Sequence, residues 1–462
     1  MDKMYLIGLT RNGTFFYKKI NDMKKMLFVF LMIISLNASS QAISLREQAK
    51  QIDEVLADRL NNLLPQLMER NGIDMWVMIT REYNEDPIVK TLLPATWISA
   101  RRRTILVFYY NPQTKVYTKS AVARYNVGDQ IEAAWDMKKY PNQWDALNLL
   151  IEKYQPNKIA VNTSENFAHA DGMDHTEYQQ FSQTLSDTYK KRIVSSEPLA
   201  VNWLETRTKK EMQLYPQLIK MSKDIIAEGF SSKVIKPGIT TSEDLVWWYR
   251  QEIIKRGFTT WFHPSVEIQR NDAVKFDHLT AFSNKGYDAK NIIQQGDLLH
   301  VDFGITYLRL NTDIQEHAYI LKTKEKDAPE FLKSAMATGN RLQDILTDQF
   351  KLNKTGNQIL ADALAQAKKE NIAATIYTHP IGYHGHAAGP TIGLWDQQGG
   401  VPGSGDFQMH YNTAYSIELN AAIEIKEWKK TVRIMLEQDG FFDETGFRYI
   451  NGRQTKLHLV GN

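Results

Sequence analysis

The chain contains no cysteine among its 462 residues. Disulfide bonds, thiolate nucleophiles and cysteine-ligated zinc are therefore excluded. The formal net charge is only +3 at neutral pH, so the composition gives no reason to expect binding to nucleic acid. Internal repeats and low-complexity segments are absent from the sequence, and 43% of the residues are hydrophobic. A globular protein of two domains is expected, because 462 residues exceed a single ordinary core.

Long apolar runs are also scarce, and the one near the N-terminus is short. Met23–Lys25 is a basic start, residues 26–36 are apolar, and Ser40 and Ala42 are small residues suited to cleavage. This layout is typical of a secretory signal peptide and is too short to span a bilayer comfortably. An uncleaved anchor is the alternative. We expect translation to start at Met23 and residues 1–42 to be removed, giving a periplasmic or secreted protein without stable membrane association.

The segment 43–200 has the pattern of an α/β domain. Helical periodicity covers residues 45–70 and 144–154, and strand-like runs cover 75–80, 104–110 and 158–162. The basic run Arg101–Arg103, with Glu82, is interpreted as a solvated surface. A domain boundary is expected between residues 195 and 206, where a strand-like run gives way to a charged helix start.

The segment 201–462 has the pattern of strands flanked by helices. A long helix is predicted over residues 209–234, and Pro216 is expected either to delay its start or to kink it. Thr240 and Glu243 are predicted to form the capping box of the next helix. Two more helices are expected at 328–349 and 356–370.

Two aspartates mark the chemistry of the second segment. Asp302 lies at the end of a buried strand-like run and Asp313 follows 313 − 302 = 11 residues later. A hairpin brings such residues side by side, and two carboxylates that close need a cation between them or one must stay protonated. Downstream, Glu418 and Glu437 lie in apolar strand-like runs, where an unpartnered carboxylate is costly. With one histidine they form an oxygen-rich set suited to two divalent ions such as Mn²⁺, Fe²⁺ or Co²⁺.

The histidine is chosen from three in one glycine-rich segment, namely His379, His384 and His386. His386 stands between Gly385 and Gly389 and is the predicted metal ligand. His384 remains a possible substitute, and in an extended segment it would point the same way as His386. His300 alternates with Asp302 and could share its face. His169, His175 and His458 are interpreted as surface residues.

These residues, in the order Asp302, Asp313, Gly385-His386-Ala387-Ala388-Gly389, Ile417-Glu418 and Glu437, resemble the pita-bread metallopeptidases. That superfamily includes Xaa-Pro aminopeptidases, prolidases, methionine aminopeptidases and creatinase. The resemblance implies an α+β fold, in which a C-terminal pita-bread domain (201–462), a curved antiparallel sheet covered by helices, follows an α/β creatinase-type N-terminal domain (43–200). It also implies a homodimer that cleaves proline-containing peptides at an N-terminal Xaa-Pro bond.

The resemblance further assigns roles. Asp302, Asp313 and Glu437 would hold or bridge two divalent ions, with Mn²⁺ first and Co²⁺, Fe²⁺ or Zn²⁺ as alternatives, and His386 and Glu418 would complete one of them. A bridging hydroxide would attack the scissile carbonyl, and Glu418 would move the proton. His379 and His278 would contact the oxyanion or the substrate carbonyl, with His263 competing for the place of His278. His384 would be a substrate contact or an outer hydrogen-bond donor.

The sequence departs from the family at three points. The segment from His379 to Gly389 looks three residues longer than the usual motif, Leu419 replaces a proline, and Met435 and Leu436 separate Ile434 from Glu437. Two alternatives stay open, the first of them because of these departures. One is a binding protein on a decayed peptidase scaffold, and the other is a creatinase-like C–N hydrolase acting on a small amide.

Overall fold

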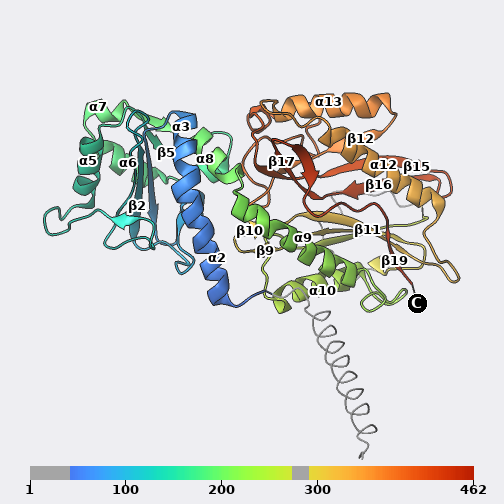
Figure 1. Cartoon of the computed structure of the whole chain (residues 1–462). Coiled ribbons are helices and arrows are strands. Elements are labelled where there is room, and N and C mark those ends of the chain that lie inside the picture. The colour runs from blue at the N-terminus through green and yellow to red at the C-terminus, as the bar shows by residue number, and fades with distance from the viewer. Residues whose placement is uncertain (1–41, 273–290, 462) are drawn as a thin grey trace, which may run out of the picture. The chain divides into compact units, whose positions relative to one another are not determined.

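The computed structural model describes residues 42–272 and 291–461 (Figure 1). Residues 43–462 group as one compact unit. The structure confirms an α+β fold with several sheets. Dividing this unit near residue 200 stays a prediction. Within the described residues, no helix is long and apolar enough to cross a membrane.

A six-stranded mixed sheet occupies the first part of the unit, in the order β4-β3-β2-β1-β5-β6. The strands are β1 (Met75–Arg81), β2 (Arg103–Tyr110), β3 (Tyr117–Val122), β4 (Glu132–Ala133), β5 (Ile159–Val161) and β6 (Ile193–Ser195). Side chains alternate along β1, so Trp76 packs with one buried cluster and Val77 with another on the opposite face. Both faces of the sheet are therefore apolar and covered.

Helices cover the two faces of this sheet (Figure 1). The helices of this part are α2 (Leu45–Asp58), a π-helical turn (Arg59–Leu63), α3 (Leu64–Asn71), α4 (Pro87–Leu92), α5 (Gln143–Tyr154), α6 (His175–Thr184), α7 (Asp187–Lys190) and α8 (Glu197–Glu205). The sequence reading missed α8, which occupies the stretch expected to be a domain boundary. Every residue of α8 from Leu199 to Glu205 is buried, so its weak amphipathic pattern hid it.

Two long helices lead into the second part, α9 (Lys209–Gly229) and α10 (Ser242–Lys255). Pro216 lies inside α9, and the prediction that it delays the start is wrong, because Thr208 and Glu211 form a capping box that starts the helix upstream. The predicted Thr240–Glu243 box is also wrong. Thr241 and Asp244 cap α10 instead, one residue further along. Both helices pack beside strands of the next sheet.

Three sheets build the second part. The first has the order β19-β11-β8-β7, the second β12-β15-β16 and the third β13-β14-β17-β18. Their strands are β7 (Ser265–Gln269), β8 (Leu298–Phe303), β11 (Ile314–Ile320), β12 (Ala373–Ile376), β13 (His379–Pro380), β14 (Thr413–Ser416), β15 (Leu419–Ile425), β16 (Lys430–Leu436), β17 (Asp439–Asp443), β18 (Gly446–Tyr449) and β19 (His458–Val460). The two-stranded β9 (Thr306–Tyr307) and β10 (Leu310–Asn311) extend the connection from β8 to β11.

All strand pairs in these three sheets are antiparallel except β11 with β19. A bridge between Gln315 and Glu437 connects the first sheet to the segment between β16 and β17. Helices α12 (Glu330–Thr347) and α13 (Gly356–Lys369) pack on the second sheet and bury its apolar face (Figure 1). The opposite face is left to carry polar side chains.

Candidate metal centre

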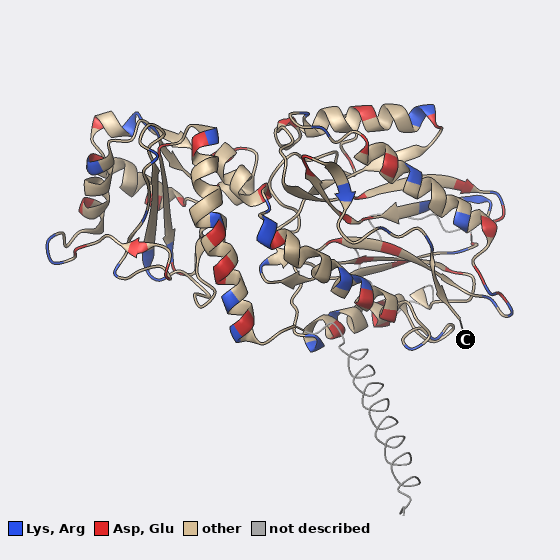
Figure 2. Cartoon of the chain, in the orientation of Figure 1, with Lys and Arg blue, Asp and Glu red and all other residues tan. Residues whose placement is uncertain are grey.

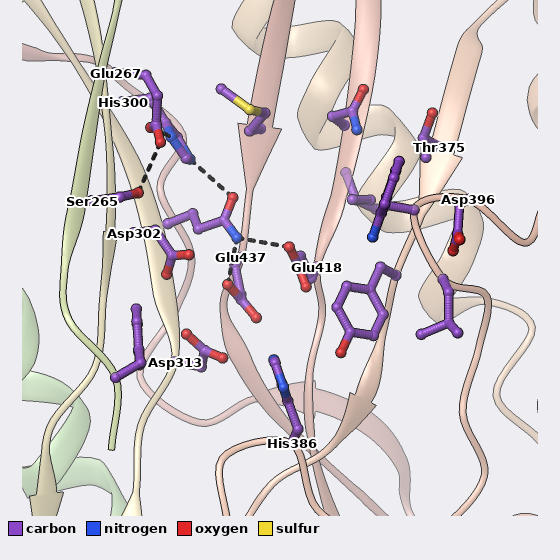
Figure 3. A pocket seen from close by; sticks show the side chains of 18 of the residues that line it. Ser265, Glu267, His300, Asp302, Asp313, Thr375, His386, Asp396, Glu418 and Glu437 are labelled. Carbon is purple, nitrogen blue, oxygen red and sulfur yellow. Dashed lines mark hydrogen bonds and ion pairs between the residues drawn. The ribbon is translucent and has the colours of Figure 1, made fainter. Parts of the chain in front are cut away.

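The five carboxylate and histidine side chains at the centre come from three sheets. Asp302 lies on β8, and Asp313 immediately precedes β11. Asp302 pairs with Gln315 in the β8–β11 register, so Asp313 is two residues from that pair and faces the same side. Glu418 precedes β15 and Glu437 follows β16. Figure 3 shows these four carboxylates converging on one space.

His379 is the histidine that joins them from β13. His379 pairs with Ser416 of β14, two residues before Glu418. Its Nε2 atom lies 3.7 Å from Asp313 Oδ2 and 3.6 Å from Glu437 Oε1. The side chain is buried, at 2% exposure.

Three overlapping groups of possible ligand atoms result, each with its atoms within 4.8 Å of one another. The groups are Asp302, Asp313 and Glu437; His379, Glu418 and Glu437; and Asp313, His379 and His386. The predicted ligands therefore come together in the fold, as does His379, which the sequence reading placed on the substrate side. His386 meets Asp313 and His379 but shares no group with the two glutamates.

The carboxylates are electrostatically frustrated in the absence of a cation. Burial raises the pKa values of Asp302 and Asp313 well above the ordinary range, and the charge of Glu437 adds to the effect. Burial and Glu437 likewise raise the pKa of Glu418. For Glu437 burial also acts upward, but the neighbouring His379 imidazole, together with hydrogen bonds from Ser416 and Gln315, lowers its pKa overall. Desolvation first, and repulsion between like charges second, therefore favour the protonated form of three of the four carboxyl groups.

Several ligand atoms at the centre have no hydrogen-bond partner among the described residues. They are Asp302 Oδ1, Asp313 Oδ1 and His379 Nε2, all buried. Buried polar atoms without partners are uncommon because desolvation is then uncompensated. A divalent cation would satisfy all three and cancel the repulsion between the carboxylates. The donor set therefore fits metal ions with a preference for oxygen and imidazole.

His386 lies at the rim of the centre rather than in its interior. The residue is exposed, and its ring lies 4.7 Å from the ring of His379 and 5.0 Å from that of Trp261. Gly385 makes this approach possible, because a Cβ atom at that position would lie 2.2 Å from the Trp261 ring. Trp261 is itself fixed, since its Nε1 donates to the Thr312 carbonyl beside Asp313 at 3.1 Å.

His384 belongs to no group of possible ligand atoms and does not line the pocket at the metal centre. Its ring lies 4.4 Å from that of His169, which is half-buried rather than a surface residue as predicted. Burial, followed by the effect of His169, lowers the pKa of His384 to about 3. Because residues 381–390 form bends instead of an extended strand, His384 and His386 do not share a face.

Of the other histidines singled out in the sequence, those that the structure describes belong to no group of possible metal ligands. His278 lies outside the described residues. His263 contacts the Trp247 ring at 5.0 Å and does not line the pocket at the metal centre. His458 is half-buried on β19, with Nε2 at 2.6 Å from Glu316, so its assignment to the surface is corrected. His175 is exposed, as expected.

The centre opens into a cavity of about 400 Å³. Apolar and aromatic side chains form much of the wall, among them Trp261, Phe262, Tyr377, Leu394 and Met435. A concave, largely apolar pocket with a few convergent polar groups is the usual form of a small-substrate site. Leu419 and Met435, the two departures noted in the sequence, both line it.

Sequence reasoning missed one residue at the centre, Gln315. Its side chain is 5% exposed and donates to Glu418 Oε1 at 2.9 Å and to Glu437 Oε2 at 2.7 Å. The available signal was a polar residue inside the buried strand β11, next to Asp313. A buried amide needs partners, and the carboxylates supply them.

Comparisons with known proteins bear on the family and the fold of the chain. Residues 217–437 match the model of metallopeptidase family M24. No match was found among the curated proteins.

Solved structures of similar fold cover most of this chain. An X-Pro aminopeptidase from Thermotoga maritima has 15% identity and a TM-score of 0.59, covering 85% of this chain and 99% of its own. A dipeptidase, PepE, from Mycobacterium ulcerans has 16% identity and a TM-score of 0.55, and the match covers 89% of this chain and 98% of the dipeptidase chain. An Xaa-Pro dipeptidase from Bacillus anthracis has 15% identity and a TM-score of 0.53, and the match covers 90% of this chain and 100% of that dipeptidase. At such identities the likeness establishes the fold. The centre built from Asp302, Asp313, His379, Glu418 and Glu437 thus lies in a chain that carries a domain of metallopeptidase family M24 with the pita-bread fold.

Proposed function

We propose that this protein is an exopeptidase that hydrolyses an N-terminal Xaa-Pro bond with two divalent metal ions. The observation that carries the proposal is the overlap of three ligand groups, in which Asp313, His379 and Glu437 each belong to two groups. Overlapping groups provide neighbouring positions for two ions. Mn²⁺ is the first candidate because the ligand atoms are mainly carboxylate oxygens.

In this proposal Asp302, Asp313 and Glu437 would hold one ion, while His379, Glu418 and Glu437 would hold the other. His379 takes the ligand role that the sequence reading gave to His386. Support comes from its burial, from its unpartnered Nε2 atom and from its place in the group that contains both glutamates. When bound, such ions polarise a scissile carbonyl and lower the pKa of coordinated water.

The remaining chemistry falls to the protein's own side chains. Glu418 takes a proton from the attacking water and passes it to the leaving amine, as general base and then acid. Its carboxylate lines the cavity, and its backbone carbonyl accepts hydrogen bonds from Tyr377 N at 3.1 Å and Thr378 Oγ1 at 2.9 Å, which fix it in place. His386, at the rim of the cavity, hydrogen-bonds the substrate carbonyl or the oxyanion.

Specificity for proline is supported by the cavity walls and by the relatives. Trp261, Phe262 and Tyr377 provide flat apolar surfaces against which a pyrrolidine ring can pack. The similar structures from Thermotoga maritima and Bacillus anthracis are described as X-Pro aminopeptidase and Xaa-Pro dipeptidase. The proposal includes export after cleavage near Ile43 and a homodimer, both carried over from the sequence.

The decisive experiment combines elemental analysis with a library of Xaa-Pro peptides. The purified protein should contain close to two divalent ions per chain and should release the first residue. Exhaustive chelation should abolish the release, and Mn²⁺ should restore it. Full activity in metal-free protein would contradict the proposal. Stable metal binding with no hydrolysis of any proline peptide would leave a binding protein as the better account.

A further inference from the structure

One wall of the cavity contains a hydrogen-bonded series that the proposed chemistry does not use (Figure 3). Its three inner members, here called the pocket triad, are Glu267, His300 and Gln315. Glu267 and His300 are cross-strand partners on β7 and β8, and Gln315 follows on β11. The triad therefore crosses three adjacent strands of the first sheet and ends at the metal centre.

The outer end of the triad is anchored. Ser265 Oγ donates to Glu267 Oε1 at 2.8 Å, and Glu267 Oε2 lies 2.5 Å from His300 Nδ1. The imidazole is 4% exposed and the Glu267 side chain 11% exposed, so water competes little for these contacts. A buried histidine bonded through one nitrogen to a carboxylate has its ring orientation fixed.

The inner end sets the orientation of an amide. A glutamine amide has donors only on nitrogen and acceptors only on oxygen. Gln315 Nε2 contacts two carboxylates, Glu418 and Glu437, so its oxygen must face the other way. There it meets His300 Nε2 at 2.9 Å, which donates to it. His300 thereby prevents the amide from turning over and presenting an oxygen to the two carboxylates.

The consequence concerns the two glutamates. Gln315 occupies Glu418 Oε1 and Glu437 Oε2, which leaves one other oxygen on each carboxylate. On Glu437 that atom is Oε1, which accepts from Ser416 Oγ at 2.8 Å and lies 3.6 Å from His379 Nε2. The second oxygen thus faces the histidine with which it would share an ion.

We infer that the pocket triad is a positioning device that aims Glu418 and Glu437 at the metal ion they share with His379. Gln315 holds the carboxylates, His300 holds the amide, and Glu267 holds the imidazole. No member of the triad belongs to a ligand group. The inference rests on the proposed metal centre and adds to it the residues that preorganise the ligands.

The test compares Gln315→Met with the wild type by calorimetric titration of the metal-free protein with Mn²⁺. Methionine keeps the length of the side chain but offers the carboxylates no donor. Affinity should fall about 10- to 100-fold, the usual effect of losing a hydrogen-bond partner of a metal ligand. At saturating Mn²⁺ turnover should recover in part, because excess metal refills the site. Gln366→Met is the matched control, since it removes an amide–carboxylate contact (2.7 Å, to Glu370) on α13.

A second pair of variants separates positioning from general stability. Glu267→Gln still offers an acceptor to His300 and should bind Mn²⁺ nearly as the wild type does, whereas Glu267→Leu should lose affinity as Gln315→Met does. Melting temperatures of the metal-free proteins show whether a variant is merely unfolded. Wild-type Mn²⁺ affinity in both Gln315→Met and Glu267→Leu would overturn the inference. A wild type that binds no metal would instead overturn the proposed function.

Discussion

Buried carboxylates occur in both parts of this molecule, but their surroundings differ. Asp86, which caps α4 in the first part, accepts hydrogen bonds through Oδ1 from the Ile88 amide at 2.7 Å and through Oδ2 from Asn162 at 2.7 Å. Glu177 on α6 accepts a hydrogen bond from Arg103 Nη2 at 3.1 Å through Oε1, and its Oε2 atom, which accepts no hydrogen bond among the described residues, forms an ion pair with Arg103 Nε at 2.8 Å. In the second part Asp302 and Asp313 each keep one oxygen without a partner among the described residues.

This contrast separates structure from function. A buried carboxyl group whose contacts are nearly complete serves the fold as a helix cap or an ion pair, because each contact offsets part of the cost of desolvation. A buried carboxylate with a vacant lone pair, next to others of its kind, destabilises the fold until a cation arrives. Figure 2 shows acidic residues in both parts, so the number of charges does not distinguish them. Their partners do.

The largest effect should follow from removing a carboxylate at the metal centre that has an oxygen without a partner. Asp302→Asn should bind fewer ions and lose essentially all peptidase activity, while its circular dichroism stays that of the folded protein. An amide cannot replace the charge that holds a divalent ion. Metal content and turnover on an Xaa-Pro peptide are the measurements. Full activity in this variant would remove Asp302 from the metal centre.

The next effect distinguishes the two histidines. His379→Ala should lose one ion and nearly all turnover, because it deletes a buried imidazole between Asp313 and Glu437. His386→Ala should keep both ions and lose turnover by about 10- to 100-fold, as is typical for groups that support a metal site from outside. Elemental analysis of both variants decides the matter. The opposite pattern of metal content would restore His386 as the ligand.

The sequence predicted the carboxylates better than the histidine. Asp302, Glu418 and Glu437 stand out because charges are rare in apolar strand-like runs. His379 could not be chosen, since its place depends on the two-residue strand β13 pairing with β14, far along the chain. The expectation for His384 relied on an extended backbone, and the glycine-rich segment bends instead. Gln315 was not predicted, because its importance lies in its contacts with Glu418 and Glu437, which are far along the chain.

A smaller effect should follow from changing the proton carrier. Glu418→Gln removes the group that takes and returns the proton, so turnover should fall by roughly 10²-fold or more. KM should change less than kcat, because the apolar walls that bind the substrate remain. Steady-state kinetics at saturating Mn²⁺ provides the test. Unchanged kcat would exclude Glu418 as the general base.

Removal of metal should make the stability of the protein fall as the pH rises. The pKa values of Asp302, Asp313 and Glu418 are raised in the folded state, so that state holds its protons more tightly than the unfolded chain. Stability is then present below the ordinary carboxyl pKa and is lost as the pH rises through the folded values. The pKa of Glu437 is lowered, so this residue alone acts in the opposite direction, against three groups whose pKa values are raised.

Melting curves of metal-free protein at pH 5 and pH 8 measure this dependence. Mn²⁺ should raise the melting temperature more at pH 8, where the carboxylates are ionised and need the cation. A metal-free protein that is more stable at pH 8 than at pH 5 would contradict the conclusion that the ionised carboxylates destabilise the metal-free centre.

The smallest effect tests the other side of the comparison. Asp86→Ala should reduce the free energy of unfolding by about 1–2 kcal/mol, since it deletes a helix cap. It should leave metal content and turnover unchanged, because the residue has no part in the centre.

The effect of Asp86→Ala on stability should also depend on pH. Burial raises the pKa of Asp86 to about 6, so the stability that the wild type draws from its protonated form is lost as the pH rises through that value. The difference in stability between wild type and variant should therefore be larger at pH 4.5 than at pH 7.5. Denaturant titrations at both values measure it, and a loss of metal in Asp86→Ala would show that the two kinds of carboxylate are not independent.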